Sequence, residues 1–230
     1  MKKIKTDNFH FQASKSSGNV SAVLMTPEDA KYLLVLAHGA GAGMKHPFME
    51  ILSAKLVEKN FAVFRYQFPY FEKVKRSPDP PNILTATVRS AVDAVSNKLK
   101  GLPVYAGGKS LGGRMTSIAA SKEALPNVKG IIFFGFPLHA PGKPSSDRSE
   151  HLFKVTVPML FLQGTRDKLA DLNLLKLVIK KLKNKAELHI IEGADHSFHI
   201  LKSSGRTDEQ VIEELADSSR EWINKVNTLQ

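Results

Sequence analysis

The chain of 230 residues has no cysteine, and none of its apolar runs approaches the length of a membrane helix. Without cysteine there are no disulfides, no thiolate metal ligands and no cysteine nucleophile. A membrane helix needs roughly 18 successive apolar residues. The first residues, Met1–Asn8, are basic but lack the apolar stretch that follows such residues in a secretory signal. We therefore expect a soluble cytoplasmic protein.

Acidic residues are also scarce relative to basic ones, with 22 Asp and Glu against 33 Lys and Arg, a net charge of +11. Such a balance is compatible with nucleic acids, anionic membranes or acidic substrates. The basic residues are spread along the chain, however, and the densest group, residues 176–185, has the pattern of a solvated helix face. We expect no nucleic-acid partner and no membrane partner, and a small-molecule substrate instead.

Apolar runs that predict buried strands alternate with segments of helical periodicity. The predicted strands are residues 32–37, 61–66, 102–106, 128–135, 158–163 and 186–191, and the predicted helices are 47–59, 83–99, 114–120, 172–182 and 208–226. Polar and apolar residues alternate over 9–25 around a turn at 14–19, which predicts an antiparallel hairpin at a sheet edge. The sequence thus predicts an α/β fold, a doubly wound and mainly parallel sheet flanked by helices, in a single domain over 1–230.

The segment Gly108-Lys109-Ser110-Leu111-Gly112 has the pattern G-x-S-x-G and lies between a predicted strand and a predicted helix. A strand, a sharp turn and a helix are the setting in which this pattern forms a nucleophile elbow. In such a turn the serine adopts a strained backbone conformation. The turn also packs so closely that a Cβ at Gly108 or Gly112 would clash. Ser110 is therefore our candidate nucleophile.

Polar residues follow other predicted strands, at the edge where sites form in parallel sheets. His38 follows the first of these strands, Asp167 follows the strand at 158–163, and His196 follows the last one. A serine hydroxyl needs a base, histidine titrates near neutral pH, and a carboxylate orients the imidazole. The order Ser, Asp, His is the one found in α/β-hydrolases.

Other residues compete for the acid and base positions. Asp171 is expected to cap a helix, and Asp195 is adjacent to His196, where side chains diverge, so Asp167 is preferred. His199 lies three positions beyond His196 and is the alternative base. His38 is expected to hold the neighbouring glycine turn by hydrogen bonding, without transferring a proton.

The sequence resembles the α/β-hydrolase superfamily, and within it the small, lid-poor branch similar to dienelactone hydrolase and to the testis-expressed hydrolase-like proteins. The segments that carry this resemblance, which spans about residues 20–228, are Leu36–Gly43, Gly108–Gly113, Gly164–Asp167 and Gly193–Phe198. Dienelactone hydrolase has a cysteine nucleophile, which this chain lacks, so its activity is not implied.

The resemblance implies Ser110 as nucleophile, Asp167 as orienting acid and His196 as base. It also implies an oxyanion hole formed by the backbone amides of Leu111 and Ala40, with Gly41 the alternative to Ala40. We expect a serine hydrolase acting on a carboxylic ester or related acyl bond, with thioesterase and peptidase activity left open. The alternative is a non-catalytic scaffold or interaction protein that retains the hydrolase fold.

No cofactor and no metal is expected, because no His, Asp or Glu spacing matches a ligand pattern. The glycine turn at 39–43 and the Gly108-Lys109-Ser110 segment both lack the spacing of a phosphate-binding loop. Walls of a substrate pocket are expected from residues 68–81 and 136–154. Apolar side chains in these segments, which are also candidates for the core, are Phe68, Tyr70, Phe71, Phe136 and Leu138. Lys73, Lys75, Arg76 and Lys109 are candidates for attracting an acidic substrate, and the alternative is that they are ordinary surface charge, a choice that the sequence leaves open.

Overall fold

One eight-stranded sheet organises the chain, with the strand order β1-β2-β4-β3-β5-β6-β7-β8. The computed structural model describes residues 3–228, so residues 1–2 and 229–230 of the predicted domain lie outside the described residues. The strands are β1 (Ile4–Ser14), β2 (Gly18–Pro27), β3 (Tyr32–Ala37), β4 (Phe61–Tyr66), β5 (Val104–Lys109), β6 (Val128–Phe134), β7 (Met159–Gly164) and β8 (Ala186–Ile191).

The sheet is mixed in the way that the sequence predicts. β1 pairs with β2 and β2 with β4 in antiparallel fashion, whereas all pairs from β4 through β3 to β8 are parallel. The N-terminal hairpin is confirmed, although its strands extend beyond the predicted limits of 9–25. The parallel strands β3, β4 and β7 are almost wholly buried, which explains their unbroken apolar sequences.

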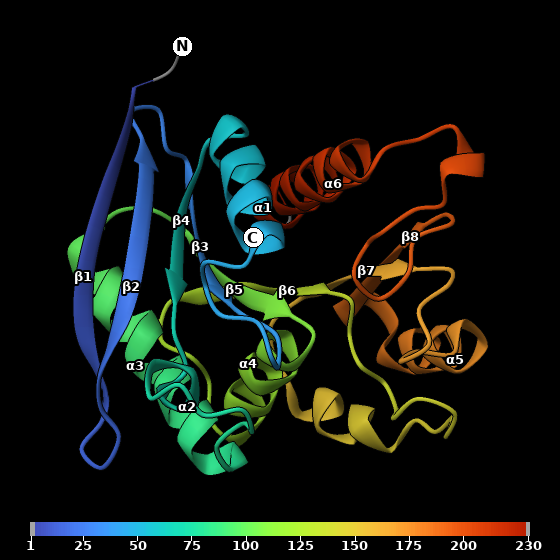
Figure 1. The fold of residues 1–230 in the computed structure, drawn as a ribbon, viewed down its shortest axis with the longest axis horizontal. Helices are drawn as coiled ribbons and strands as arrows, with labels where there is room; N and C mark the ends of the chain where they lie inside the picture. Colours follow the sequence, from blue (N-terminus) through green and yellow to red (C-terminus); the bar gives the residue numbers. More distant parts are fainter. Residues whose placement is uncertain (1–2, 229–230) are drawn as a thin grey trace.

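Helices cover both faces of this sheet (Figure 1), with α1 and α6 on one face and α3, α4 and α5 on the other. The helices are α1 (Pro47–Glu58), α2 (Pro69–Glu72), α3 (Pro81–Lys98), α4 (Leu111–Lys122), α5 (Leu172–Leu182) and α6 (Asp208–Thr228). Three 3₁₀ segments complete the fold: η1 (Asp147–Lys154), η2 (Lys183–Lys185) and η3 (Lys202–Ser204). Each face of the sheet has its own apolar core, so the sheet is the shared wall of two hydrophobic layers.

Two segments that the sequence predicts as irregular contain short helices. Residues 68–81 include α2, which begins at Pro69, and proline suits the first position of a helix because its fixed φ is already helical. Residues 136–154 end in η1. Within residues 3–228, no helix combines the length and the apolar character that a membrane span requires.

The helix after the glycine-rich turn begins at Leu111 rather than at the predicted Arg114. Gly112 and Gly113 lie inside its first turn, where glycine ordinarily weakens a helix. They are there because the helix starts directly against the sheet. A Cβ on Gly113 would lie 2.7 Å from the Gly108 carbonyl oxygen. The close approach brings the start of α4 to the carboxyl end of β5.

Candidate active site

Ser110 lies in the turn between β5 and α4 in a backbone conformation that L-residues rarely adopt. Its φ is 49° and its ψ is −112°. The turn holds this conformation through two hydrogen bonds, from the Ser110 amide to the Phe134 carbonyl at 3.2 Å and from the Arg114 amide to the Ser110 carbonyl at 3.1 Å. The predicted strain at the serine is confirmed.

The predicted steric role of the flanking glycines is also confirmed. A Cβ on Gly108 or on Gly112 would lie 2.4 Å from the carbonyl oxygen of Ala37, at the end of β3. Real Cβ atoms do not approach an oxygen so closely, because the two van der Waals spheres overlap. Both positions therefore need glycine for the turn to sit against β3.

The structure brings the three residues of the predicted constellation together at the carboxyl edge of the sheet. The Oγ of Ser110 lies 2.8 Å from Nε2 of His196, and Nδ1 of His196 lies 2.7 Å from Oδ2 of Asp167. The Asp167 side chain is fully buried, and that of His196 is 25% exposed. The imidazole thus links a buried carboxylate to a hydroxyl at the surface of the site.

The carboxylate of Asp167 is held by two further donors. Its Oδ2 accepts a hydrogen bond from Nε2 of Gln163, and its Oδ1 accepts one from the Leu169 amide at 2.8 Å. The amide oxygen of Gln163 in turn accepts from the Phe136 amide at 2.9 Å. Sequence reasoning missed Gln163. The available signal is a polar residue ending an otherwise apolar buried strand.

The loop that carries Asp167 and the loop that carries His196 are joined to each other by hydrogen bonds. The Arg166 amide donates to the Ala194 carbonyl at 2.9 Å, and the Gly193 amide donates to Oγ1 of Thr165 at 2.8 Å. At Gly164 the approach is so close that a Cβ would lie 2.2 Å from the Ala194 oxygen. The acid and the base are therefore positioned as one unit.

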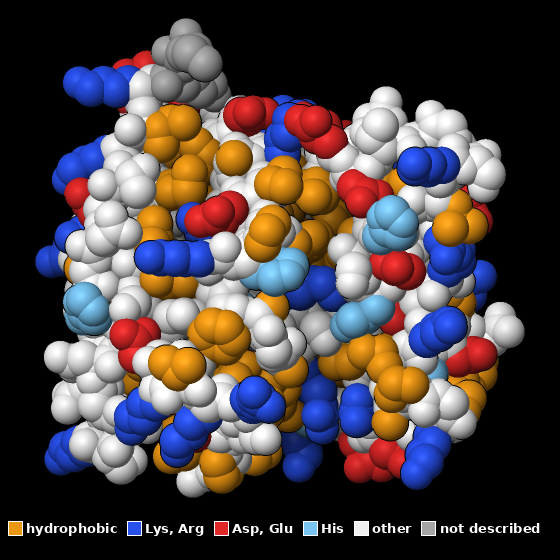
Figure 2. Space-filling view, viewed as in Figure 1, with side chains coloured by type: hydrophobic (Ala, Val, Ile, Leu, Met, Phe, Trp, Pro, Cys, Tyr) orange, Lys and Arg blue, Asp and Glu red, His pale blue; other side chains and the backbone are white. Residues whose placement is uncertain are grey.

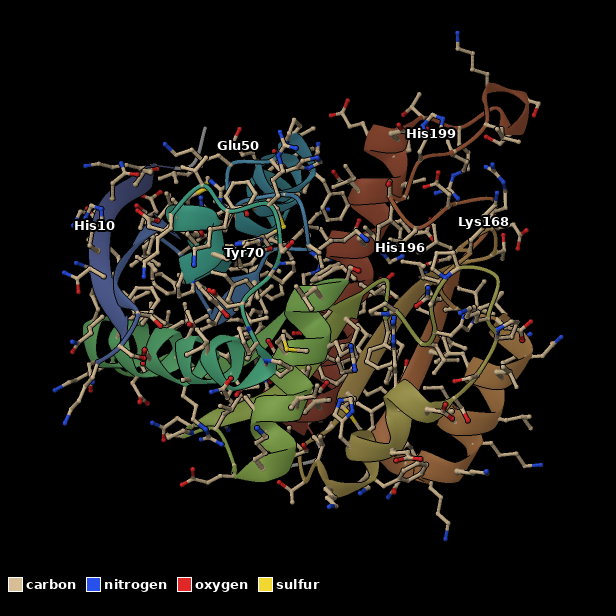
Figure 3. The ribbon with its side chains drawn as sticks, turned by 60° about the horizontal axis from the view of Figure 1, so that its bottom comes forward. His10, Glu50, Tyr70, Lys168, His196 and His199 are labelled. Carbon is tan, nitrogen blue, oxygen red and sulfur yellow. The ribbon has the colours of Figure 1, made fainter. Side chains whose placement is uncertain are left out.

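The alternative acids and the alternative base have other structural roles. Asp171 is the N-cap of α5, as predicted. Oδ1 of Asp195 accepts a hydrogen bond from the His199 amide at 3.0 Å and so closes the turn that contains the imidazole. The exposed His199 ring instead pairs with Asp208 at 2.8 Å. In Figure 3 His199 lies farther from α4 than His196 does, next to the segment that leads to α6.

His38 holds the glycine turn, as the sequence predicts. Its Nε2 accepts a hydrogen bond from the Phe68 amide at 3.0 Å, so Nδ1 carries the proton that is donated to the Gly39 carbonyl at 2.8 Å. Complete burial lowers the pKa of His38 to about 4. The ring is thus neutral and serves as a fixed bridge between two backbone segments.

The glycine turn lies directly beside the serine. A Cβ built on Gly39 would be 3.7 Å from the Cβ of Ser110. Ala40 follows Gly39 and is exposed, whereas Leu111 opens α4. The first amides of a helix have no partner inside the helix, and the helix dipole favours negative charge there. Leu111, one of the two residues predicted to donate to an oxyanion, thus directly follows Ser110, and the other, Ala40, follows the glycine that lies beside it.

Lys109, a candidate for attracting an acidic substrate in the sequence, is engaged within the protein. Its Nζ donates a hydrogen bond to the carbonyl oxygen of His196 at 2.5 Å. The ammonium lies 5.9 Å from the ring centre of Phe48 and 5.4 Å from that of Phe198. Burial lowers the pKa of Lys109 to about 8, although the charges of Asp167 and Asp195 oppose this shift. The other three predicted cations, Lys73, Lys75 and Arg76, are exposed.

Most of the predicted apolar wall residues belong to the core. Phe68, Tyr70, Phe136 and Leu138 are buried, and only Phe71 is partly exposed. The five remaining histidines have hydrogen-bond partners in the structure: His10, His46, His139, His151 and His189. Among residues 3–228, no group of three or more His, Asp or Glu side chains is placed to hold a metal ion.

Comparison with known families and structures identifies the family and the fold. Residues 30–224 match a family model described as alpha/beta hydrolase domain. A dienelactone hydrolase from Anabaena variabilis is 19% identical with a TM-score of 0.74, over 96% of this chain and 98% of that one. A serine hydrolase without a lid from Xanthomonas campestris is 17% identical with a TM-score of 0.73, over 95% of each chain. A cold-adapted esterase from an Arctic metagenomic library is also 17% identical, with a TM-score of 0.66 over 95% of this chain and 94% of that one. At these identities the likeness to the solved structures shows a shared fold.

Proposed function

The chain belongs to the alpha/beta hydrolase domain family, and we propose that it is a serine hydrolase that cleaves a carboxylic ester or related acyl bond. The observation that carries the proposal is the hydrogen-bonded series from Ser110 through His196 to Asp167. A strained serine at a helix start, a half-buried imidazole and a buried carboxylate are the parts that acyl transfer needs. The structural relatives, among them a lidless serine hydrolase and an esterase, are in keeping with it.

In the proposed reaction, Oγ of Ser110 attacks the carbonyl carbon while Nε2 of His196 removes the hydroxyl proton. The carbonyl oxygen becomes an oxyanion that the amides of Leu111 and Ala40 stabilise. Individual donors of this kind contribute about 10²–10³ to the rate in studied enzymes. Asp167 keeps the proton on Nδ1 of His196 and stabilises the imidazolium that forms.

Collapse of the tetrahedral intermediate breaks the bond to the leaving group, which receives the proton from His196. An acyl group then remains on Ser110. His196 next removes a proton from water, and the resulting hydroxide attacks the acyl carbon. Breaking the bond to Oγ releases the acid and returns the proton to Ser110. The cycle consumes one water and needs no cofactor.

The proposal is tested with a fluorophosphonate probe and with 4-nitrophenyl butyrate, comparing wild type with Ser110→Ala and Ser121→Ala. Ser121 is a matched control because it lies on the same helix and its hydroxyl bonds only to the Ile118 carbonyl. We expect Ser110→Ala to lose both labelling and turnover, and Ser121→Ala to keep both. Turnover that is equal in wild type and Ser110→Ala would instead favour the scaffold alternative.

A further inference from the structure

One face of α4 leads from the candidate nucleophile to a second polar cluster. Ser110, Arg114 and Ser117 are separated by four and then three positions, so they lie on the same side of the helix. Oγ of Ser117 lies 2.8 Å from Nε2 of His151 in η1, which shows that η1 packs against this face. Arg114 therefore lies between the serine turn and η1. Side chains on a helix lean toward its N-terminus, so that of Arg114 leans toward Ser110.

The guanidinium of Arg114 is partly withdrawn from water without a counter-charge. Its Nε is buried and has no hydrogen-bond partner, and no carboxylate forms an ion pair with it within residues 3–228. Burial lowers the pKa of Arg114, and the neighbouring charge of Arg148 lowers it further. A buried cation without a partner is costly, because nothing replaces the water it has lost.

Arg148, in η1, brings a second guanidinium close enough to Arg114 for the two charges to act on each other. It lies three residues before His151 in η1, and residues three apart share a face of a 3₁₀ helix. One Nη of Arg148 donates to the His139 carbonyl at 3.1 Å, which leaves the rest of its fork available. Burial and the charge of Arg114 lower the pKa of His151 to about 4, so its ring is neutral between the two arginines at physiological pH.

We propose that Arg114 and Arg148 form a subsite for an anionic group, a carboxylate above all, on the acyl substrate that Ser110 attacks. An anion between the two guanidinium groups would offset the repulsion between their positive charges. The planar guanidinium also matches the geometry of a carboxylate, which can accept two parallel hydrogen bonds from it. Figure 2 shows several Lys and Arg side chains on the lower part of this face of the molecule, around a hollow in the surface. The inference rests on the proposed function and names the substrate class for it.

This assignment uses other residues than the cations that the sequence suggested for an acidic substrate. Those candidates are Lys73, Lys75, Arg76 and Lys109. Of these, Lys109 is engaged with the His196 carbonyl and the other three are exposed. An exposed lysine attracts anions only weakly and is screened by salt. Arg114 and Arg148 are both partly buried, and Arg114 lies one helical turn from the nucleophile.

The test compares two esters that differ in a single charge, mono-4-nitrophenyl adipate and 4-nitrophenyl hexanoate. Both have the same leaving group and a six-carbon acyl chain, and only the adipate ends in a carboxylate. We expect the ratio of kcat/KM for adipate over hexanoate to fall about tenfold in Arg148→Gln and in Arg114→Gln, as for the loss of one charge-assisted hydrogen-bonded contact. Lys143→Gln is the control, because it removes the same charge from an exposed position of the neighbouring loop and should leave the ratio within about twofold.

A second arm separates carboxylate from phosphate as the bound anion. Free adipate and inorganic phosphate are compared as inhibitors of hexanoate hydrolysis at constant ionic strength. Stronger inhibition by adipate assigns a carboxylate substrate, stronger inhibition by phosphate assigns a phosphorylated one, and either inhibition should weaken in Arg148→Gln. Thermal unfolding of each variant shows whether it is folded. If Arg148→Gln is not folded, it is replaced in the comparison by Arg148→Lys, which keeps the charge but loses the two-pronged geometry of the guanidinium.

The outcomes separate this subsite from the hydrolase activity on which it rests. A ratio that is unchanged in both arginine variants, with both esters still hydrolysed, overturns the subsite and leaves the hydrolase proposal standing. A ratio that falls equally in Lys143→Gln also overturns it, because the preference would then come from overall charge. Wild-type protein that hydrolyses neither ester and takes up no fluorophosphonate overturns both.

Discussion

The ammonium of Lys109 donates a hydrogen bond to the backbone carbonyl of His196 at 2.5 Å. Lys109 directly precedes the candidate nucleophile in the chain, whereas His196 lies on the loop after β8. Two strands, β6 and β7, stand between β5 and β8 in the sheet. The lysine therefore ties the candidate base to the strand that carries the nucleophile, and we regard it as a positioning residue.

Lys109→Met should lower kcat for a neutral ester by about tenfold, as expected for the loss of a hydrogen bond from a charged group. In wild type the pKa of Lys109 is lowered to about 8, so the ammonium becomes a neutral, weaker donor above that pH. Activity should consequently decline above about pH 8 in wild type, and this decline should be absent from the pH profile of Lys109→Met. Lys73→Met, which changes an exposed lysine, should keep the wild-type profile.

The same group makes stability depend on pH with a definite sign. The pKa of Lys109 is about 8 in the folded protein against an ordinary value of 10.5, so between these values the unfolded chain binds more protons. The contribution of Lys109 to the free energy of unfolding therefore rises with pH between about 8 and 10.5. Below about pH 8 the full cost of burying the charged ammonium is present. Urea unfolding of wild type and Lys109→Met at several pH values measures this. Identical pH slopes for the two proteins would contradict the assignment.

Asp167→Asn should lower kcat by about 10³–10⁴-fold with little change in the fold, because an amide no longer fixes the imidazole tautomer or stabilises its charged form. Asp195→Asn is the matched control. Asp195 uses its side chain to accept backbone amides, and an asparagine oxygen can do the same. Steady-state turnover of 4-nitrophenyl butyrate distinguishes the two. If Asp195→Asn proves the more damaging variant, the acid has been assigned to the wrong residue.

Gln163→Leu should reduce both activity and stability while keeping the side-chain volume. The change removes a donor to Asp167 and leaves the buried Phe136 amide without its acceptor. Leaving a buried amide without an acceptor lowers the free energy of unfolding by about 1–3 kcal/mol. With one donor lost, the Asp167 carboxylate is held less firmly against His196, and we expect kcat to fall about tenfold. Chemical unfolding and turnover are measured together, with the exposed Gln12→Leu as the control. Full activity in Gln163→Leu would show that Asp167 needs no such support.

Gly112→Ala should destabilise the protein by at least about 1–3 kcal/mol, the usual cost of an overpacked site. Its new Cβ would lie 2.4 Å from the Ala37 oxygen and 2.6 Å from the His38 oxygen, both of them backbone atoms that cannot move independently. Gly39→Ala makes a fair comparison, because there the nearest atom is 3.5 Å away. Thermal unfolding of the two variants should separate them clearly. Equal midpoints would show that the turn can shift away from β3.

Much of the fold was predictable because the parallel strands are buried on both faces and therefore have unbroken apolar sequences. The position of Ser110 was predictable for a related reason, since only a tight strand-to-helix turn requires glycines at both Gly108 and Gly112. The short helices in the segments 68–81 and 136–154 were not predicted, because prolines and polar residues obscure the periodicity that reveals longer helices.

The surroundings of the site depend on contacts that sequence spacing does not encode. Gln163 matters because, one residue before the end of β7, its side-chain amide donates to Asp167. Lys109 has the charge of a substrate-binding residue, but the packing of two aromatic rings turns it toward the His196 loop. Arg114 becomes notable only when η1 is known to cover its face of α4. In each case the role of the residue depends on which neighbouring element its side chain contacts, and the sequence does not show this.

The backbone of Ser110, with its φ of 49° and ψ of −112°, has one more consequence. Conformations of this kind cost an L-residue about 1–3 kcal/mol, and glycine adopts them freely. Replacing Ser110 by glycine would therefore relieve the backbone strain and would at the same time remove the hydroxyl. At this position the stability of the turn and the proposed nucleophile thus make opposite demands, because the residue that best suits the backbone conformation has no hydroxyl.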